Sequence, residues 1–127
     1  LKASWTKGGK ERVIPLLTTT QRDVLDRAHR LAGAGALIPS DKQYIQQLRV
    51  YERHTTQAGL SRLHGLRHAY AQQRYLDLTG WLSPAAGGPT SAELSPQQKQ
   101  QDHAARLTIS QELGHVREQI TAVYLGR

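Results

Sequence analysis

Apolar side chains recur at helical spacing in the first third of the chain. Between positions 20 and 32 they fall three or four residues apart, which places them on one face of a helix. This face consists of Val24, Leu25, Ala28, Leu31 and Ala32. Thr20 with Asp23 is a capping signature, and Gly33 ends the pattern. The segment predicts a first helix.

A second apolar stripe is also preceded by a helix-capping signature. Ser40 is followed three positions later by Gln43, the spacing of a capping box. The stripe consists of Tyr44, Ile45, Leu48 and Tyr51. Gly59 supplies a stop, so a second helix is expected between these signals.

A third helix is predicted over about residues 65–78. Its inward positions are expected to be Leu66, Ala69, Tyr70 and Leu76. Arg67 and Arg74 then lie elsewhere on its surface. His64 immediately precedes the N-terminus of this helix.

Residues 79–96 interrupt the helical pattern. Their breakers are Gly80, Pro84, Gly87, Gly88, Pro89 and Pro96. This density of glycine and proline predicts a loop or flexible insertion with poor order.

Helical signals resume at Ser95, which precedes Pro96 and Gln98 as a helix start does. The pattern reaches Leu113 before Gly114, although Thr108 with Gln111 leaves a break near position 108 open. Near the end of the chain, a final short helix carries three residues at i, i+3 and i+4, which are Ile120, Val123 and Tyr124. Tyr124 is therefore expected near a buried face.

The first residues show a different period. Leu1, Ala3 and Trp5 alternate with polar neighbours, TKGGK interrupts, and RVIPL resumes a β-branched run. This predicts a basic β-hairpin over residues 1–16. The expected fold class is mainly α with a small N-terminal β-hairpin (α+β).

Composition restricts the chain to one domain's worth of sequence. At 127 residues, a single core is the default. We expect one incomplete domain with the hairpin at 1–16, helices at 18–78, the insertion at 79–96 and further helices at 97–127. The chain begins at Leu1 without any methionine, so we expect a piece of a longer polypeptide.

The net charge of +7 favours a polyanionic partner, although ordinary solubility has the same signature. No apolar run is long enough for a transmembrane helix, and no signal peptide is evident. With zero cysteines there are no disulfides or thiolate ligands, which is compatible with a reducing cytosol.

Several residues have the chemistry needed to transfer a phosphodiester to a protein hydroxyl. That reaction requires a nucleophile, a proton acceptor, cations around the non-bridging oxygens and an acid for the leaving oxygen. Tyr124 is the candidate nucleophile, and a phenol of ordinary pKa near 10 needs a neighbouring base or cations. His64 and Arg67 share one side of a helix, where the arginine can fork onto phosphate oxygens.

Each candidate has a plainer explanation. Arg67 with His64 also fits a surface arginine beside a capping histidine, and His115 after Gly114 also fits a helix C-cap. Lysines in a turn, such as Lys7 and Lys10, are usually only solvated. His64 and His68 have i, i+4 metal-ligand spacing, but there is no H-E-x-x-H arrangement and no cysteine, so no metal is expected.

The order of these signals is more specific than any one of them. TKGGKERVIPL resembles the G-K-G-x-K-x-R-x-x-P-L hairpin of the tyrosine recombinase, or phage integrase, family. HGLRHAYAQQRY resembles its H-x-L-R-H-x-x-A box, and LGHVREQITAVY resembles the box that closes with the nucleophile. Nearly the whole chain resembles the C-terminal part of the catalytic domain, a helical fold truncated at its N-terminus.

The resemblance implies a role for each matched residue. Tyr124 attacks the scissile phosphate to form a 3′-phosphotyrosyl intermediate, without ATP, metal or other cofactor. Arg67 clamps the phosphate, and His64 is the general base or its hydrogen-bonding partner. His115 donates to a non-bridging oxygen, and Lys7 is the general acid, with Lys10 as the fallback. Further DNA contacts are expected from Lys10, Arg12, Arg62, His68, Arg74 and Arg117.

Three departures from the family pattern limit these expectations. The family's first catalytic arginine has no counterpart upstream of the hairpin, so this piece alone is expected to be inactive or impaired. The 79–96 connection is long, and the chain stops at Arg127. The expected partner is double-stranded DNA in the cytoplasm, in a tetrameric synapse of the full-length protein. The alternative is a non-catalytic basic DNA-binding module on the same scaffold.

Overall fold

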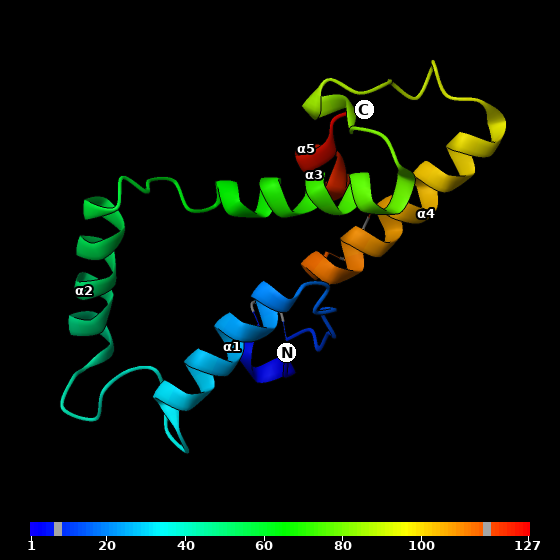
Figure 1. The fold of residues 1–127 in the computed structure, drawn as a ribbon. Coiled ribbons are helices and arrows are strands. Elements are labelled where there is room, and N and C mark those ends of the chain that lie inside the picture. The colour runs from blue at the N-terminus through cyan, green and yellow to red at the C-terminus, as the bar shows by residue number, and fades with distance from the viewer. Residues whose placement is uncertain (7–8, 116–117) are drawn as a thin grey trace. The chain divides into compact units, whose positions relative to one another are not determined.

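The computed structural model describes residues 1–6, 9–115 and 118–127. In these residues the α-helices are α1 (Thr19–Ala32), α2 (Tyr44–Gln57), α3 (Gly65–Thr79), α4 (Pro96–Leu113) and α5 (Ala122–Leu125). Short 3₁₀ helices are η1 (Ala3–Trp5), η2 (Pro84–Ala86) and η3 (Glu118–Thr121). Figure 1 shows the helices in chain order. The chain is mainly helical, as the sequence predicts.

The chain divides into two compact units. The first unit comprises Leu1–Ile14 and Leu63–Arg127, and the second comprises Pro15–Arg62. Each unit has its own internal packing.

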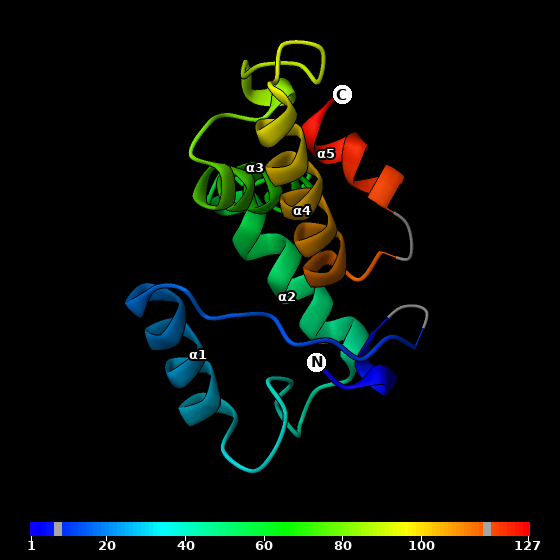
Figure 2. The ribbon, with the colours of Figure 1, turned by 90° about the vertical axis from the view of Figure 1, so that its right-hand side faces the viewer.

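The core of the first unit lies where α3 meets α4 and α5. Its buried members are Ala71, Tyr75, Ala105, Ile109, Leu113, Tyr124 and Leu125. Tyr70, Leu78 and Trp81 pack against this cluster from its margin. α3 contacts both α4 and α5, and Figures 1 and 2 show these three helices together. The last short helix is therefore part of the core.

A polar network joins α3 to α4 beside this core. The Tyr75 hydroxyl donates to Asp102 Oδ1 at 2.5 Å and accepts from Trp81 Nε1 at 3.2 Å. Arg106 Nε donates to Asp102 at 2.8 Å. Burial and the Asp102 hydrogen bond raise the pKa of Tyr75 to about 12, so its hydroxyl remains a donor.

Two further contacts hold α5 to the body of the first unit. Gln72 Nε2 donates to the Tyr124 carbonyl at 3.2 Å, and Arg106 Nη1 donates to the Gly126 carbonyl at 2.9 Å. Gly126 also approaches η2 closely, since a Cβ there would lie 2.8 Å from Ala85 N. These contacts place Tyr124 against the helices of its own chain.

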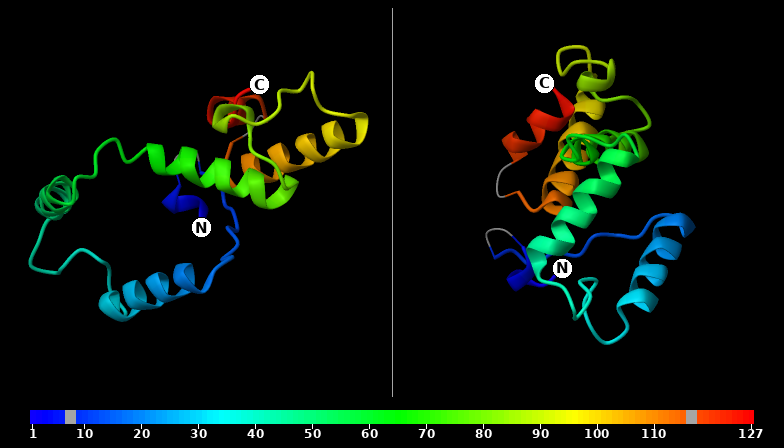
Figure 3. Two further views of the ribbon diagram at one scale, coloured as in Figure 1. Left: turned by 45° about the horizontal axis from the view of Figure 1, so that its top comes forward. Right: turned by 90° about the vertical axis from the view of Figure 1, so that its left-hand side faces the viewer.

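The 79–96 segment, expected to be a flexible insertion, contains η2 and contributes to the interior. Ser83 and Leu94 are buried, and Gly88 N donates to the Ser83 carbonyl at 2.9 Å. Figure 3 shows this yellow-green connection running between α3 and α4. Through η2, the segment packs closely against Gly126.

The predicted N-terminal β-hairpin is wrong, because no strand occurs in the described residues. Ala3–Trp5 instead form η1, closed by the Thr6 amide on the Ala3 carbonyl at 3.1 Å. The Leu1 amine donates to the Arg12 carbonyl at 2.6 Å, the Arg12 amide donates to Leu1, and Thr6 Oγ1 donates to the Lys10 carbonyl at 2.8 Å. Among the described residues, these bonds and the 3₁₀ turn take the place of a strand ladder.

The C-terminal ends of the helices agree with the sequence predictions more closely than their starts do. α1 is capped by Thr18 with Gln21 rather than by Thr20, and α2 is capped by Gln43 with Gln46 rather than by Ser40. α4 begins at the predicted cap, Ser95, and shows no break at Thr108. At α1 and α4 the cap side chain and the side chain three residues on each accept from the other's amide. At α2 the Gln43 amide donates to Gln46 Oε1 at 2.8 Å, and the Gln46 amide donates to the Gln43 carbonyl at 3.0 Å.

The predicted inward face of α3 is partly wrong. Leu66 is 64% exposed and Ala69 is exposed, whereas Ala71, Tyr75 and Thr79 are buried. The buried stripe follows the i, i+4 row that faces α4 and α5, which apolarity alone did not identify.

The second unit has no buried residue between positions 15 and 62. The apolar stripes of α1 and α2 remain largely exposed, with Leu31 at 82% and Tyr44 at 68%. Among the described residues, no helix is both long and apolar enough to cross a membrane.

Candidate active site

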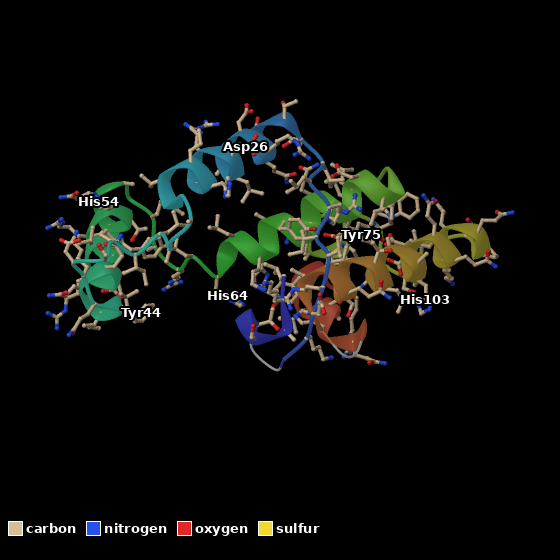
Figure 4. The ribbon with its side chains drawn as sticks, turned by 90° about the horizontal axis from the view of Figure 1, so that it is seen from below. Asp26, Tyr44, His54, His64, Tyr75 and His103 are labelled. Carbon is tan, nitrogen blue, oxygen red and sulfur yellow. The ribbon has the colours of Figure 1, made fainter. Side chains whose placement is uncertain are left out.

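Three candidate residues lie on the first turns of α3. His64 is the N-cap residue of α3, and Arg67 and His68 follow it at i+3 and i+4. This spacing places all three on the same side of the helix. Figure 4 shows His64 at the beginning of α3 and Tyr75 farther along it.

The end of α4 supplies the next residue. Gly114 is the C-cap in the left-handed conformation, with φ +75°, and the His115 amide donates to the Ser110 carbonyl at 2.8 Å. Glycine adopts this conformation without the steric cost of a Cβ. The turn places the His115 ring near Arg67, whose Nη2 lies 3.4 Å from His115 Nε2 and donates to the Leu113 carbonyl at 2.8 Å.

Tyr124 brings the third segment to the same place. Its ring stacks on His115 at 5.4 Å and 16°, and packs against His68 at 4.6 Å. The His64 ring lies 6.3 Å away, and Arg67 Cζ lies 6.0 Å from the Tyr124 ring centre. At 6% exposure, the tyrosine is enclosed by the candidate residues.

A cavity of about 450 Å³ opens at this meeting point. Its lining comprises Arg12, His64, Arg67, Leu113, Gly114, His115 and Tyr124. All seven belong to the first unit, so the cavity is formed within one compact body. His64, Arg67, His115 and Tyr124 thus converge, as the proposed chemistry requires.

The arginines of the first unit differ in their partners. Arg74 is paired with Glu112 at 3.1 Å, and Arg106 is paired with Asp102 at 2.8 Å. Arg12 and Arg67 form no ion pair with any described carboxylate. A cavity that gathers uncompensated guanidinium groups is suited to bind an anion.

The same cations act on the imidazole between them. Burial, then Arg67, then Arg12 lower the pKa of His115 below its ordinary value. A neutral ring is therefore favoured near pH 7. A guanidinium only donates, so Nε2 accepts from Arg67 and the proton is assigned to Nδ1, which is buried without a partner.

Comparison with known families identifies the chain's relatives. The family model described as Integrase matches residues 4–73, more than half of the chain. The chain belongs to the integrase family. The resemblance to phage integrases is confirmed, and a recombinase-type enzyme acting in DNA integration is supported. No curated protein and no solved structure matches the chain.

The integrase match covers part of the cavity. His64 and Arg67 lie inside the matched residues, whereas His115 and Tyr124 lie beyond them. The family match therefore does not extend to the candidate nucleophile.

The remaining integrase candidates are distributed unevenly. Lys7 and Arg117 lie outside the described residues. Arg62 belongs to the second unit, and Lys10 is partly exposed with its carbonyl accepting from Thr6 Oγ1 at 2.8 Å. His68 contacts Tyr124. Arg74 is held by Glu112 and does not line the cavity.

Two residues of structural importance had not been singled out in the sequence. Gln72 lies one turn beyond His68 on the same face and binds the Tyr124 carbonyl. Glu112 accepts from Tyr70 at 2.7 Å and from Arg74, inside an otherwise poorly amphipathic helix. The i, i+4 spacing from His68 places Gln72 on the same helix face and could have identified it from the sequence. No comparable sequence pattern identifies Glu112.

His64 and His68 do not form part of a larger metal-ligand cluster. Their rings meet edge to face at 5.9 Å, and the described residues contain no group of three or more His, Cys, Asp or Glu placed to hold a metal. Both rings instead contact Tyr124.

Proposed function

We propose that this chain is part of a site-specific DNA recombinase that breaks and rejoins DNA through a 3′-phosphotyrosyl intermediate. The observation that carries the proposal is the convergence on one cavity of Tyr124, His115, Arg67 and His64. These residues come from α5, the end of α4 and the start of α3. The family match supports integrase activity, and the cavity supports tyrosine as the nucleophile.

The proposed reaction is balanced at each step. Tyr124 Oη forms a bond to the scissile phosphorus while the bond from phosphorus to the 5′ oxygen breaks. The phenolic proton passes to a base, and the leaving 5′ oxygen takes up a proton to become a hydroxyl. In the second step a 5′-hydroxyl gives up its proton and bonds to the phosphorus of the phosphotyrosine; the bond to Tyr124 Oη breaks, and the phenolate takes up a proton as the strand is rejoined. The phosphotyrosyl ester conserves the bond energy, so no cofactor enters the scheme.

The cavity residues have distinct roles in this proposal. Arg67 donates to non-bridging oxygens, and His115 is proposed as a further hydrogen-bond donor to them. His64, whose ring centre lies 6.3 Å from that of Tyr124, is proposed as the general base or its hydrogen-bonding partner. Lys7 is proposed as the acid for the leaving oxygen, with Lys10 as the fallback.

Double-stranded DNA is the proposed partner, in agreement with the family and with the net charge of +7. Strand exchange between two duplexes requires four cleavages, so a tetrameric synapse of the full-length protein in the cytoplasm completes the proposal. The residues proposed to contact DNA include Lys10, Arg12, Arg62, His68 and Arg117.

A nicked suicide substrate tests the proposal directly. The full-length protein is incubated with DNA containing its site, and the covalent adduct is resolved by denaturing electrophoresis. We expect an adduct that Tyr124→Phe abolishes, because phenylalanine keeps the ring packing but lacks the nucleophile. Tyr51→Phe, at a half-exposed tyrosine of α2, is the matched control and should form the adduct.

DNA binding without any adduct would refute the enzyme and favour the alternative, a non-catalytic DNA-binding module. An adduct that persists in Tyr124→Phe would refute Tyr124 as the nucleophile while leaving the reaction class intact.

A further inference from the structure

We propose that Arg12 is a second phosphate-binding arginine of this cavity and that Gly114 provides the space for its guanidinium. The inference rests on the proposed function, because it assigns the cavity's ligand as a phosphodiester oxyanion. It adds a residue from the N-terminal segment to a site otherwise formed by α3, α4 and α5.

The position of Arg12 is the first support. Its backbone is paired with Leu1 in both directions, and its side chain lines the cavity together with Arg67 and His115. A guanidinium therefore reaches the cavity from a segment far from α3 in the sequence.

Gly114 explains how that side chain fits. A Cβ built on Gly114 would collide with Arg12 Nη1 and lie 2.7 Å from Arg12 Cζ. Gly80, the C-cap of α3 with φ +83°, has the same left-handed conformation but nothing within 4 Å of such a Cβ. The left-handed backbone at 114 favours glycine, and a methyl group there would in addition push the Arg12 guanidinium out of its present position.

The charge state of Arg12 is the second support. Its Nε is buried and has no hydrogen-bond partner, and no described carboxylate pairs with it. Elsewhere in this unit, the partly buried Arg74 and the buried Arg106 are each matched by an acid. A buried guanidinium is costly unless an anion compensates it, so an oxyanion in the cavity would fill this role.

The arrangement suits a phosphodiester in particular. Two guanidinium groups with an imidazole beside them provide donors from different directions around a tetrahedral anion. Arg12 also helps to lower the pKa of His115, in agreement with a short separation between the two groups.

The first experiment uses the 127-residue chain with inorganic phosphate as the probe. Binding at constant pH and the pKa of His115 are both followed from the ring-proton NMR signals of His115. Arg12→Ala should weaken phosphate binding by about tenfold or more, as expected for loss of hydrogen bonds to a charged group. It should also raise the pKa of His115. Arg12→Lys keeps the positive charge, so it should weaken phosphate binding and raise the pKa of His115 less than Arg12→Ala does.

Arg30→Ala is the matched control, because it removes the same group at an exposed position of α1. It should leave both quantities unchanged. Equal phosphate affinity in Arg12→Ala and the parent chain would overturn the inference, as would equal losses in Arg12→Ala and Arg30→Ala.

A glycine pair provides a second, independent test. Gly114→Ala and Gly80→Ala place the same methyl group at helix C-caps with similar backbone strain. Only Gly114→Ala should displace Arg12, so it should lower phosphate affinity and raise the pKa of His115 as Arg12→Ala does. Comparable phosphate affinity in the two glycine variants would contradict the proposal that Gly114 provides the space for the Arg12 guanidinium.

Failure of this inference differs from failure of the proposed function. Absence of any covalent adduct between the parent protein and DNA refutes the reaction, whereas phosphate binding that is indifferent to Arg12 refutes only the role of Arg12.

Discussion

At the scale of single residues, the charged groups around the core divide into two classes. Arg74 and Arg106 face carboxylates, and their positive charges are compensated within the fold. Arg67 faces a carbonyl and an imidazole. In the first class, the Arg74–Glu112 pair joins α3 to α4 and the Arg106–Asp102 pair lies within α4. The second class leaves positive charge in the cavity.

DNA-binding measurements should separate these two classes. Arg67→Ala should reduce the slope of log K against log salt concentration by about one, as removal of one phosphate contact does. Arg74→Ala should leave that slope unchanged and instead destabilise the fold by about 3 kcal/mol, because Glu112 loses its buried partner. Fluorescence anisotropy across a salt series and denaturant unfolding measure the two quantities. A reduced slope for Arg74→Ala would return that residue to the DNA-binding set.

The lowered pKa of His115 has a consequence for acid stability. The folded state binds the His115 proton more weakly than the unfolded state, whose imidazole has its ordinary pKa near 6.5. The neutral ring is therefore fully stabilising above about pH 6.5, and stability falls as the pH drops from there through the folded pKa, by at most about 1.4 kcal/mol per pH unit.

His115→Gln should weaken this acid dependence, measured as the free energy of unfolding between pH 7.5 and pH 5. His54→Gln, at an exposed position of α2, is the control and should retain it. An unchanged dependence in His115→Gln would show that other groups cause the acid effect.

At the scale of elements, local signals determined where helices lie, and competition between similar signals determined their first residues. Ser95 is a true N-cap, since it accepts from Gln98 N at 3.3 Å while Gln98 Oε1 accepts from Ser95 N. Ser40 had the same sequence signature, yet α2 begins later, at the box of Gln43 with Gln46.

This difference predicts unequal effects of two similar substitutions. Ser95→Ala should destabilise the chain by about 1 kcal/mol, the usual value of an N-cap hydroxyl. Ser40→Ala should change stability by less than about 0.5 kcal/mol, as for ordinary surface positions. Denaturant unfolding followed by circular dichroism checks both. Equal losses would mean that Ser40 caps α2 after all.

At the scale of the whole molecule, burial is confined to one of the two units. All the buried core residues belong to the first unit, and residues 15–62 contribute none. Since helix stability in proteins comes mainly from packing of an apolar face, α1 and α2 have little tertiary support of their own.

Native-state hydrogen exchange should therefore distinguish the units. Amides of α1 and α2 should exchange through local opening of low free energy, whereas those of α3 and α4 near Tyr75 and Ile109 should require nearly global unfolding. Mass spectrometry of deuterated peptides from the isolated chain measures this. Equal protection in both units would show that the apolar faces of α1 and α2 are covered in solution.

The sequence by itself determined the helical segments, their glycine ends and the order of the candidate residues, because caps, breaks and apolar periods are local properties. It did not determine the conformation of Ala3–Trp5, which form a 3₁₀ turn where a strand was expected. Only the tertiary structure decided which side chains meet. The pairing of Arg74 with Glu112, the packing of His68 on Tyr124 and the fit of Arg12 against Gly114 join residues distant in the chain. Such contacts follow from how α3, α4 and α5 pack, a property no local pattern contains.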